Sequence, residues 1–148
     1  LTSAPGPLAD QADIDRAFPL PSDANATVES ILSTLETMEQ DSSANGKWVA
    51  RTLKSLRAAS PTSLKVTMEQ VKRGASLSLA DCYAMELRMA MRFMRKGSDF
   101  YEGVRATLID KSGDPSWNPS AVTDVTPEQV DAFFAPFTPQ EDINELSL

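Results

Sequence analysis

The sequence predicts an all-α fold class with no strands, and three observations lead to this prediction. From residue 25 onward, apolar residues recur three and four positions apart, the spacing of one helix face. Ser60-Pro61 and Thr126-Pro127 are typical helix starts, because a hydroxyl caps the first turn and proline fits the first helical position. No segment alternates apolar and polar residues as a half-buried strand does.

Length, charge and two scarce residue types exclude several classes of function. The chain has 148 residues, the size of one domain, and a net charge of −7. This acidic balance argues against nucleic acid as the main partner, although a local basic patch is compatible with the average. The sequence contains no histidine, so no His-ligated metal and no Ser-His-Asp or Cys-His site comes from this chain alone. Cys82 is the single cysteine, and no apolar run approaches the ~18 residues that span a bilayer.

Residues 1–24 are predicted to form an irregular, extended segment. Four prolines lie there among polar residues and scattered apolar ones, and proline removes backbone donors while fixing φ. The opening residues lack the basic and apolar regions of a signal peptide, and the start at Leu1 is typical of the inside of a longer protein.

Residues 25–135 are predicted to form a helical domain, with 136–148 as an acidic tail in which Thr138-Pro139 opens a short helix. Apolar spacing predicts two helices, over 27–39 and 44–58. A third helix begins at Pro61 and ends at Gly74, because glycine commonly closes a helix. Further helices are expected over 79–95, 99–110 and 127–134.

The 79–95 segment is predicted to be the core helix. It is apolar over most of its circumference, apart from a narrow stripe of Asp81, Arg88, Arg92 and Arg95. Two interpretations of the stripe remain open: an anion site for groups such as phosphates, or a solvated face with salt bridges. The second is favoured, since surface charges usually have no further role.

Four other features of the helices have a structural and a chemical interpretation. Glu86 lies on the apolar side, where a structural contact is favoured over catalysis. Cys82 has no neighbouring base in the sequence and is expected to be an inert buried thiol. Gly103 weakens its helix and indicates that another element approaches closely. The methionines of the core helix are expected to fill core rather than to line an adaptable groove: Met85, Met89, Met91 and Met94.

Two longer runs carry a resemblance to a known family. Residues 60–67 read SPTSLKVT, similar to the SPTSLK(I/V)T run of 3-hydroxyisobutyryl-CoA hydrolases, a branch of the enoyl-CoA hydratase/isomerase (crotonase) superfamily. Residues 99–111 read DFYEGVRATLIDK and resemble the DFxEGVRAxLIDK signature of that branch, and Met85-Glu86-x-Arg88 resembles its ME-x-R segment. The resemblance extends from Thr27 to Phe134.

The resemblance implies a function for the chain as part of a larger fold. In that family a core with strands precedes these helices and supplies the oxyanion-hole amides and acidic catalytic residues. The matched part resembles the C-terminal helical region, which packs over the acyl-CoA site. The parent reaction is hydrolysis of a short β-hydroxyacyl-CoA thioester in valine catabolism, in the mitochondrial matrix.

The resemblance also implies the site residues and partners. No catalytic residue and no metal ligand is expected in this chain, and no cofactor beyond the CoA of the substrate. Lys111 aligns with a lysine that approaches CoA phosphates and is the one substrate-binding residue expected. The expected partner is an N-terminal crotonase core or companion chain, whose residues complete the apolar faces of 79–95 and 99–110. Phe100, Val104 and Leu108 are expected to touch that partner or the core helix beside them. No membrane span and no direct nucleic-acid binding are expected.

Two other functions remain open. One is a non-catalytic structural subunit of a larger mitochondrial assembly, such as the ribosomal small subunit. The other is an unrelated helical interaction module, against which the signature run argues.

Overall fold

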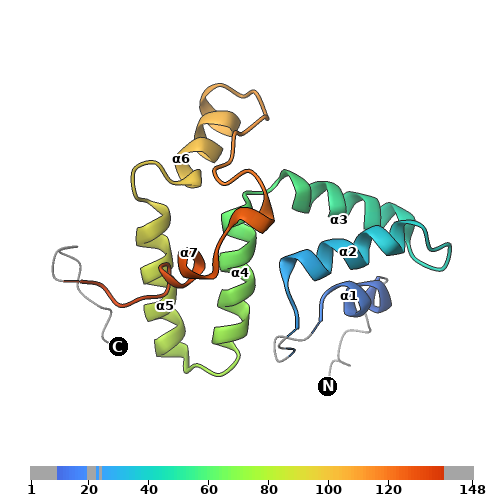
Figure 1. Ribbon diagram of the computed structural model, residues 1–148, viewed down its shortest axis with the longest axis horizontal. Helices are drawn as coiled ribbons and strands as arrows, with labels where there is room; N and C mark the ends of the chain where they lie inside the picture. The colour runs from blue at the N-terminus through green and yellow to red at the C-terminus, as the bar shows by residue number, and fades with distance from the viewer. Residues whose placement is uncertain (1–9, 20–22, 24, 139–148) are drawn as a thin grey trace, which may run out of the picture. The chain divides into compact units, whose positions relative to one another are not determined.

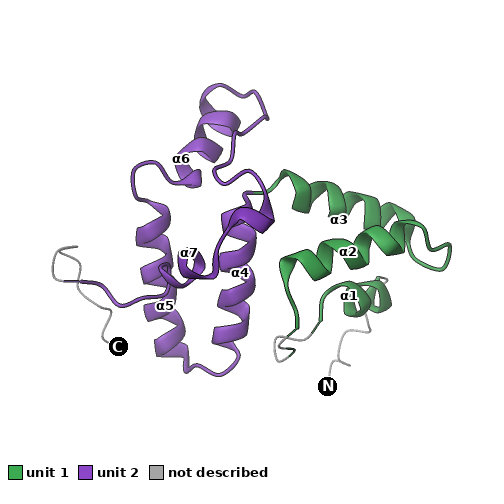
Figure 2. Ribbon diagram, in the orientation of Figure 1, with its two compact units in different colours: residues 1–59 green, residues 60–148 purple. Residues whose placement is uncertain are grey.

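The regular elements of the computed structural model, which describes residues 10–19, 23 and 25–138, are helices (Figure 1). No strand occurs in this part of the chain, and none of its helices is both long and apolar enough to cross a membrane. Two compact units divide the chain, residues 1–59 and residues 60–148 (Figure 2). The elements in order are α1 (Gln11–Ala17), α2 (Val28–Glu39), α3 (Gly46–Ala58), α4 (Pro61–Gly74), α5 (Leu79–Phe93), α6 (Asp99–Val104), the π-helix η1 (Arg105–Ile109), the 3-10 turn η2 (Val122–Asp124) and α7 (Pro127–Asp131).

The first unit is built on the pair α2 and α3, which pack against each other. Thr27 starts α2 with a capping box, in which the Thr27 hydroxyl accepts from Ser30 N at 3.0 Å and the Ser30 hydroxyl accepts from Thr27 N at 3.0 Å. The apolar residues that predicted these two helices form the core of the unit. The fully buried side chains are Leu35, Met38, Val49 and Leu53.

Residues 11–17 differ from the predicted extended segment, because they form helix α1. A helix of seven residues is too short to show a clear apolar period and is marginal alone. Contacts with distant residues hold it instead: the Asp13 carboxylate accepts from Asn45 N at 2.8 Å, and Arg16 pairs with Asp41 at 2.6 Å. The predicted helix after Thr138-Pro139 and most of the predicted tail lie outside the described residues.

The second unit has its core where α4, α5 and α7 meet. Ser60 caps α4 as predicted, since its hydroxyl accepts from Ser63 N at 3.1 Å, and Pro61 occupies the first helical position. The buried cluster combines residues from the three helices and the segments beside them: Val66, Met85, Met89, Val125, Val130 and Phe134. Phe93 and Phe133 extend it, with ring centroids 4.5 Å apart.

Helix α5 supplies core residues, but the described residues bury only part of its circumference. Completion of its apolar face by residues outside this chain stays a prediction. Met85 and Met89 are buried, whereas Leu79 is 71% exposed and Tyr83 and Met94 are about half exposed. The apolar character of a residue alone does not show whether its side chain is buried by this chain or remains exposed. Within the described residues, one face of α5 is therefore uncovered.

The prediction that Arg92 lies on a solvated stripe is wrong. Arg92 is only 7% exposed, and its guanidinium donates to the carbonyl oxygens of Phe133 (3.5 Å) and Pro136 (3.2 Å) and lies over the Phe137 ring. Backbone carbonyls therefore surround the cation where the sequence suggested water or carboxylates. Nothing in the local sequence indicates this, because the contacts lie about 40 residues away.

Arg92→Ala is expected to destabilise the protein by about 2–3 kcal/mol, since it removes the packed methylene groups of a buried side chain and its charge-assisted hydrogen bonds to the carbonyl oxygens of Phe133 and Pro136. Urea denaturation followed by circular dichroism measures the change. Lys96→Ala is the matched control, because Lys96 is an exposed cation three residues beyond α5, and it should change stability by less than about 0.5 kcal/mol. Equal losses in the two variants would contradict the structural role of Arg92.

Candidate functional site

The signature run 99–111 forms α6 and η1, and its charged residues hold a long irregular segment in place. Asp99 accepts from the Ser60 hydroxyl at 2.5 Å and from Asn118 N at 3.1 Å. Glu102 accepts from Ser116 N at 2.6 Å. These carboxylates thus satisfy backbone donors that have no helix or strand to join.

Glu102 is also the partner of a fork-like ion pair. Arg105 Nε and Nη2 donate to the two Glu102 oxygens at 2.7 and 2.6 Å. The Arg105 guanidinium, together with Ser116 N, lowers the pKa of the Glu102 carboxyl to about 2. Glu102 is therefore a fixed anion at neutral pH and holds no proton to transfer.

Gly103 confirms the predicted close approach of another element. A Cβ atom at this position would lie 3.3 Å from the edge of the Trp117 indole, closer than ordinary van der Waals contact. The segment after η1 folds back over α6 at this glycine, so the signature glycine serves packing rather than chemistry.

Lys111 lies just beyond η1, is exposed and has a left-handed backbone with φ of 52°. The π turn before it is a rare geometry that often occurs near functional sites. It leaves Leu108 67% and Ile109 70% exposed, and Phe100 on α6 is about half exposed. The structure thus places two exposed apolar side chains, Leu108 and Ile109, and a cation at the end of η1, with Phe100 at the start of α6.

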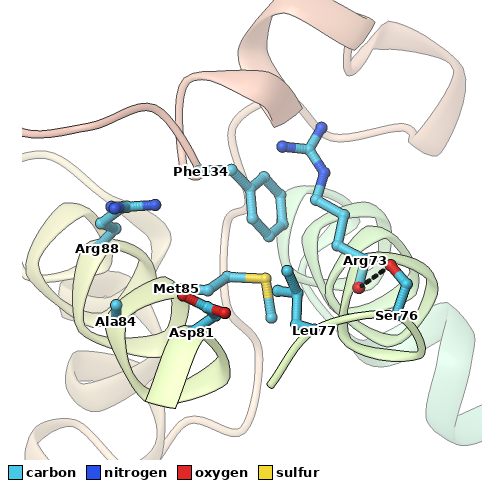
Figure 3. A pocket seen from close by; sticks show the side chains of 8 residues that line it. All are labelled: Arg73, Ser76, Leu77, Asp81, Ala84, Met85, Arg88 and Phe134. Atoms are coloured by element: carbon cyan, nitrogen blue, oxygen red, sulfur yellow. Dashed lines mark hydrogen bonds between the residues drawn. The ribbon is translucent and has the colours of Figure 1, made fainter. Parts of the chain in front are cut away.

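A separate pocket opens between the end of α4, the start of α5 and Phe134, with a volume of about 360 Å³. Met85, Leu77 and Phe134 provide apolar walls, and Figure 3 shows Arg73 and Arg88 on opposite sides of the Phe134 ring. The Arg73 guanidinium lies 4.2 Å from the centroid of that ring. No local signal predicts this contact, because the two residues are about 60 positions apart.

The pocket is suited to binding rather than to catalysis. Its Arg73 cation already pairs with Glu69 (2.7 Å) and with Asp131. Asp81 accepts from the Ser78 hydroxyl at 2.6 Å, and the Ser76 hydroxyl donates to Arg73 O, so both polar groups stabilise the turn between the helices. No group of three metal-ligating side chains occurs in the described part of the chain.

The other sequence candidates have structural contacts. Glu86 is exposed, not on a covered apolar face as expected, and accepts from Gln70 Nε2 at 3.2 Å. Cys82 is half-buried, with its sulfur 3.9 Å from Gly74 O. Met85 and Met89 fill core, whereas Met94 is exposed. Neither Glu86 nor Cys82 lies beside a partner that would activate it among these contacts.

A family model described as enoyl-CoA hydratase/isomerase matches residues 2–134. The chain belongs to the enoyl-CoA hydratase/isomerase family. The resemblance drawn from the signature runs is thereby confirmed.

The relatives of this chain within the family include proteins named as hydrolases and a protein named as a ribosomal subunit. A mitochondrial 3-hydroxyisobutyryl-CoA hydrolase of Dictyostelium discoideum is 39% identical over 132 residues, which cover 88% of this chain and 32% of that protein. The small ribosomal subunit protein mS47 of Arabidopsis thaliana is 37% identical over 118 residues, covering 78% of this chain and 28% of that protein. The chain thus spans about a third of the length of the curated relatives it matches, and their names support a mitochondrial location.

A solved structure corrects the predicted all-α fold class. The chain resembles a carnitinyl-CoA dehydratase from Mycobacterium thermoresistibile with a TM-score of 0.74 and 29% identity, over 94% of this chain and 37% of that one. Its helices therefore are part of a crotonase fold, and all-α is the wrong class. Helical periodicity reports the local structure of each segment, whereas a fold class depends on all the elements that pack together.

The dependence of the protein's stability on pH in the acidic range tests the structural role of Glu102. Its carboxyl has a pKa of about 2 when folded, below its ordinary value of 4.5, so its stabilising contribution is complete above pH ~4.5 and is lost as the pH falls towards 2. Glu102→Gln should therefore flatten the fall in urea midpoint between pH 4.5 and 2. Asp114→Asn, at an exposed carboxylate on the following segment, should leave that fall unchanged. A Glu102→Gln profile parallel to the wild type would contradict the assignment.

Proposed function

We propose that this chain provides the helical part of a 3-hydroxyisobutyryl-CoA hydrolase-like protein of the mitochondrial matrix, where it packs over an acyl-CoA site. The observation that carries the proposal is the 39% identity with the Dictyostelium hydrolase over 88% of this chain. Hydrolysis of a short β-hydroxyacyl-CoA thioester is then the reaction of the whole protein, with its catalytic groups on a crotonase core.

The chemistry of the described residues supports this division of roles. Thioester hydrolysis requires donors aligned on the developing oxyanion and a group that activates water. The signature carboxylates Asp99 and Glu102 are instead held by backbone amides and Arg105. The exposed apolar side chains at the end of η1, Leu108 and Ile109, are suited to packing against a core that excludes water from the acyl-CoA.

Lys111 would be the contact of this chain with the substrate. It lies two residues beyond the exposed apolar end of η1, after Asp110, and an ammonium group suits the phosphates of CoA. Phe100, Val104 and Leu108, spaced four residues apart along α6 and η1, would face the core beside it. The position of Lys111 at a helix end is the support for this role.

A chimera tests the proposal directly. In it, this chain replaces the segment of the Dictyostelium hydrolase that it matches, and hydrolysis of 3-hydroxyisobutyryl-CoA is followed by thiol release. The chimera should hydrolyse the thioester, whereas this chain alone should show no hydrolysis above background. A folded but inactive chimera, or an active isolated chain, would contradict the proposal.

Lys111→Ala in the chimera should raise KM for the CoA thioester about five- to tenfold, the loss expected for one charge-assisted phosphate contact, with kcat little changed. Lys96→Ala removes an equally exposed cation and should leave KM unchanged. A KM equal to that of the wild-type chimera would exclude Lys111 from the substrate site while leaving the hydrolase assignment intact.

A second candidate function is a structural subunit of a larger mitochondrial assembly. The observation that favours it is the 37% identity with the plant small ribosomal subunit protein over 78% of this chain. Under this function the helices would serve assembly, and the chimera would fold without hydrolysing the thioester.

A further inference from the structure

Helix α3 has a charge opposite to that of the protein as a whole. Its 13 residues include Lys47, Arg51, Lys54 and Arg57 and no acidic residue. The rest of the sequence contains the other ten Lys and Arg residues and all 21 Asp and Glu residues, so it is strongly acidic. The acidic average of the chain therefore hides a local basic helix.

Three of these cations form one exposed face, defined here as the α3 basic face: Lys47, Arg51 and Lys54. At positions i, i+4 and i+7 they lie within an arc of about 60° and along about 10 Å of helix. Val49 and Leu53 point to the buried side of α3. The α3 basic face is thus directed away from the core of its unit.

The cations of this face have no counter-ion among the described residues. Arg57 pairs with Glu36 of α2 at 2.8 Å, but no ion pair or hydrogen bond joins the side chains of Lys47, Arg51 or Lys54 to another described residue. Like charges four residues apart on a helix repel each other mildly. An external polyanion would remove this repulsion.

We propose that the α3 basic face binds the phosphate backbone of RNA, an inference that rests on the second proposed function. Its charge is complementary to phosphate, and Lys and Arg neutralise such a backbone without a shaped pocket. The face gives no apolar anchor for a protein partner, because its exposed neighbours are the small residues Ala50, Ser55 and Ala58. The apolar side that would enter a membrane is packed against α2.

Fluorescence anisotropy of the whole chain with a labelled 30-nucleotide poly(U) RNA tests the proposal. Binding should weaken as salt rises, with a slope of log K against log salt near −2, as three contacts to a single strand require. The triple variant Lys47→Gln/Arg51→Gln/Lys54→Gln should lose at least tenfold in affinity at 50 mM salt, and glutamine keeps the helix propensity of the replaced residues.

Control variants show whether a loss of RNA affinity comes from the charge of the α3 basic face, from misfolding or from cations elsewhere on the protein. Lys47→Arg/Lys54→Arg should retain binding, and Lys47→Gln should weaken it about three- to fivefold while Lys96→Gln leaves it unchanged. Unaltered affinity in the triple variant would overturn the proposal. So would preferential binding to poly-glutamate, which would indicate an acidic protein, or to phosphatidylserine vesicles, which would indicate a membrane.

The RNA-binding proposal and the proposed hydrolase function can be contradicted independently of each other. The triple variant placed in the chimera should leave thioester hydrolysis unchanged, because the α3 basic face is not part of the proposed substrate contact. RNA binding by an active chimera would support the inference together with the hydrolase function, whereas no RNA binding by a folded wild-type chain would overturn the inference alone.

Discussion

The second unit depends on one constraint: the long segment between η1 and α7 is irregular apart from the short turn η2, so side chains must satisfy much of its backbone. Asp99 and Glu102 accept from the amides of Asn118 and Ser116, and Lys65 donates to Val125 O at 3.0 Å. Each of these side chains comes from a helix, α4 or α6. Val125 is buried, and an unpaired buried backbone group costs about as much as a lost hydrogen bond, so the bond from Lys65 fixes this part of the segment to α4. Ser116 and Asn118 are exposed, and their bonds to α6 position the segment on that helix.

This constraint gives the signature residues structural roles within the described part of the chain. Ser60 is shared, since its hydroxyl caps α4 and donates to Asp99. Gly103 is required by the indole of Trp117, and Glu102 is held by Arg105. The signature is therefore a folding signature, and a chain that preserves it can belong to an enzyme or to a structural protein.

Local signals were sufficient to predict most helices. Ser60 and Thr126 cap α4 and α7 as predicted, and the Thr27 and Ser78 hydroxyls cap α2 and α5 in the same way. The failures depend on distant residues. Helix α1 is held by Asn45 and Asp41, and Arg92 is buried by carbonyls of residues 133 and 136. A periodic pattern contains no information on either contact.

The candidate surfaces were harder to predict than the helices for a related reason. The apolar positions of α5 predicted a core helix, and the structure divides them into Met85 and Met89, which this chain covers, and Leu79 and Tyr83, which it leaves exposed. The sequence-wide charge likewise gave no indication of the α3 basic face. The apolar pattern of a helix does not show which of its faces this chain covers, and the net charge of the chain does not show the charge of one helix face.

The two exposed surfaces have different chemistry, and each restricts the partners it can accept. The end of η1 combines Leu108 and Ile109 with a single cation, Lys111, which suits a mostly apolar contact beside a few phosphates. The α3 basic face combines cations with small residues, which suits a charged and hydrated partner. A protein that used only the first surface would gain nothing from three adjacent cations with no counter-ion in the described chain, since they repel one another. The charge distribution of α3 therefore favours a partner whose chemistry differs from that of the apolar contact suited to the end of η1.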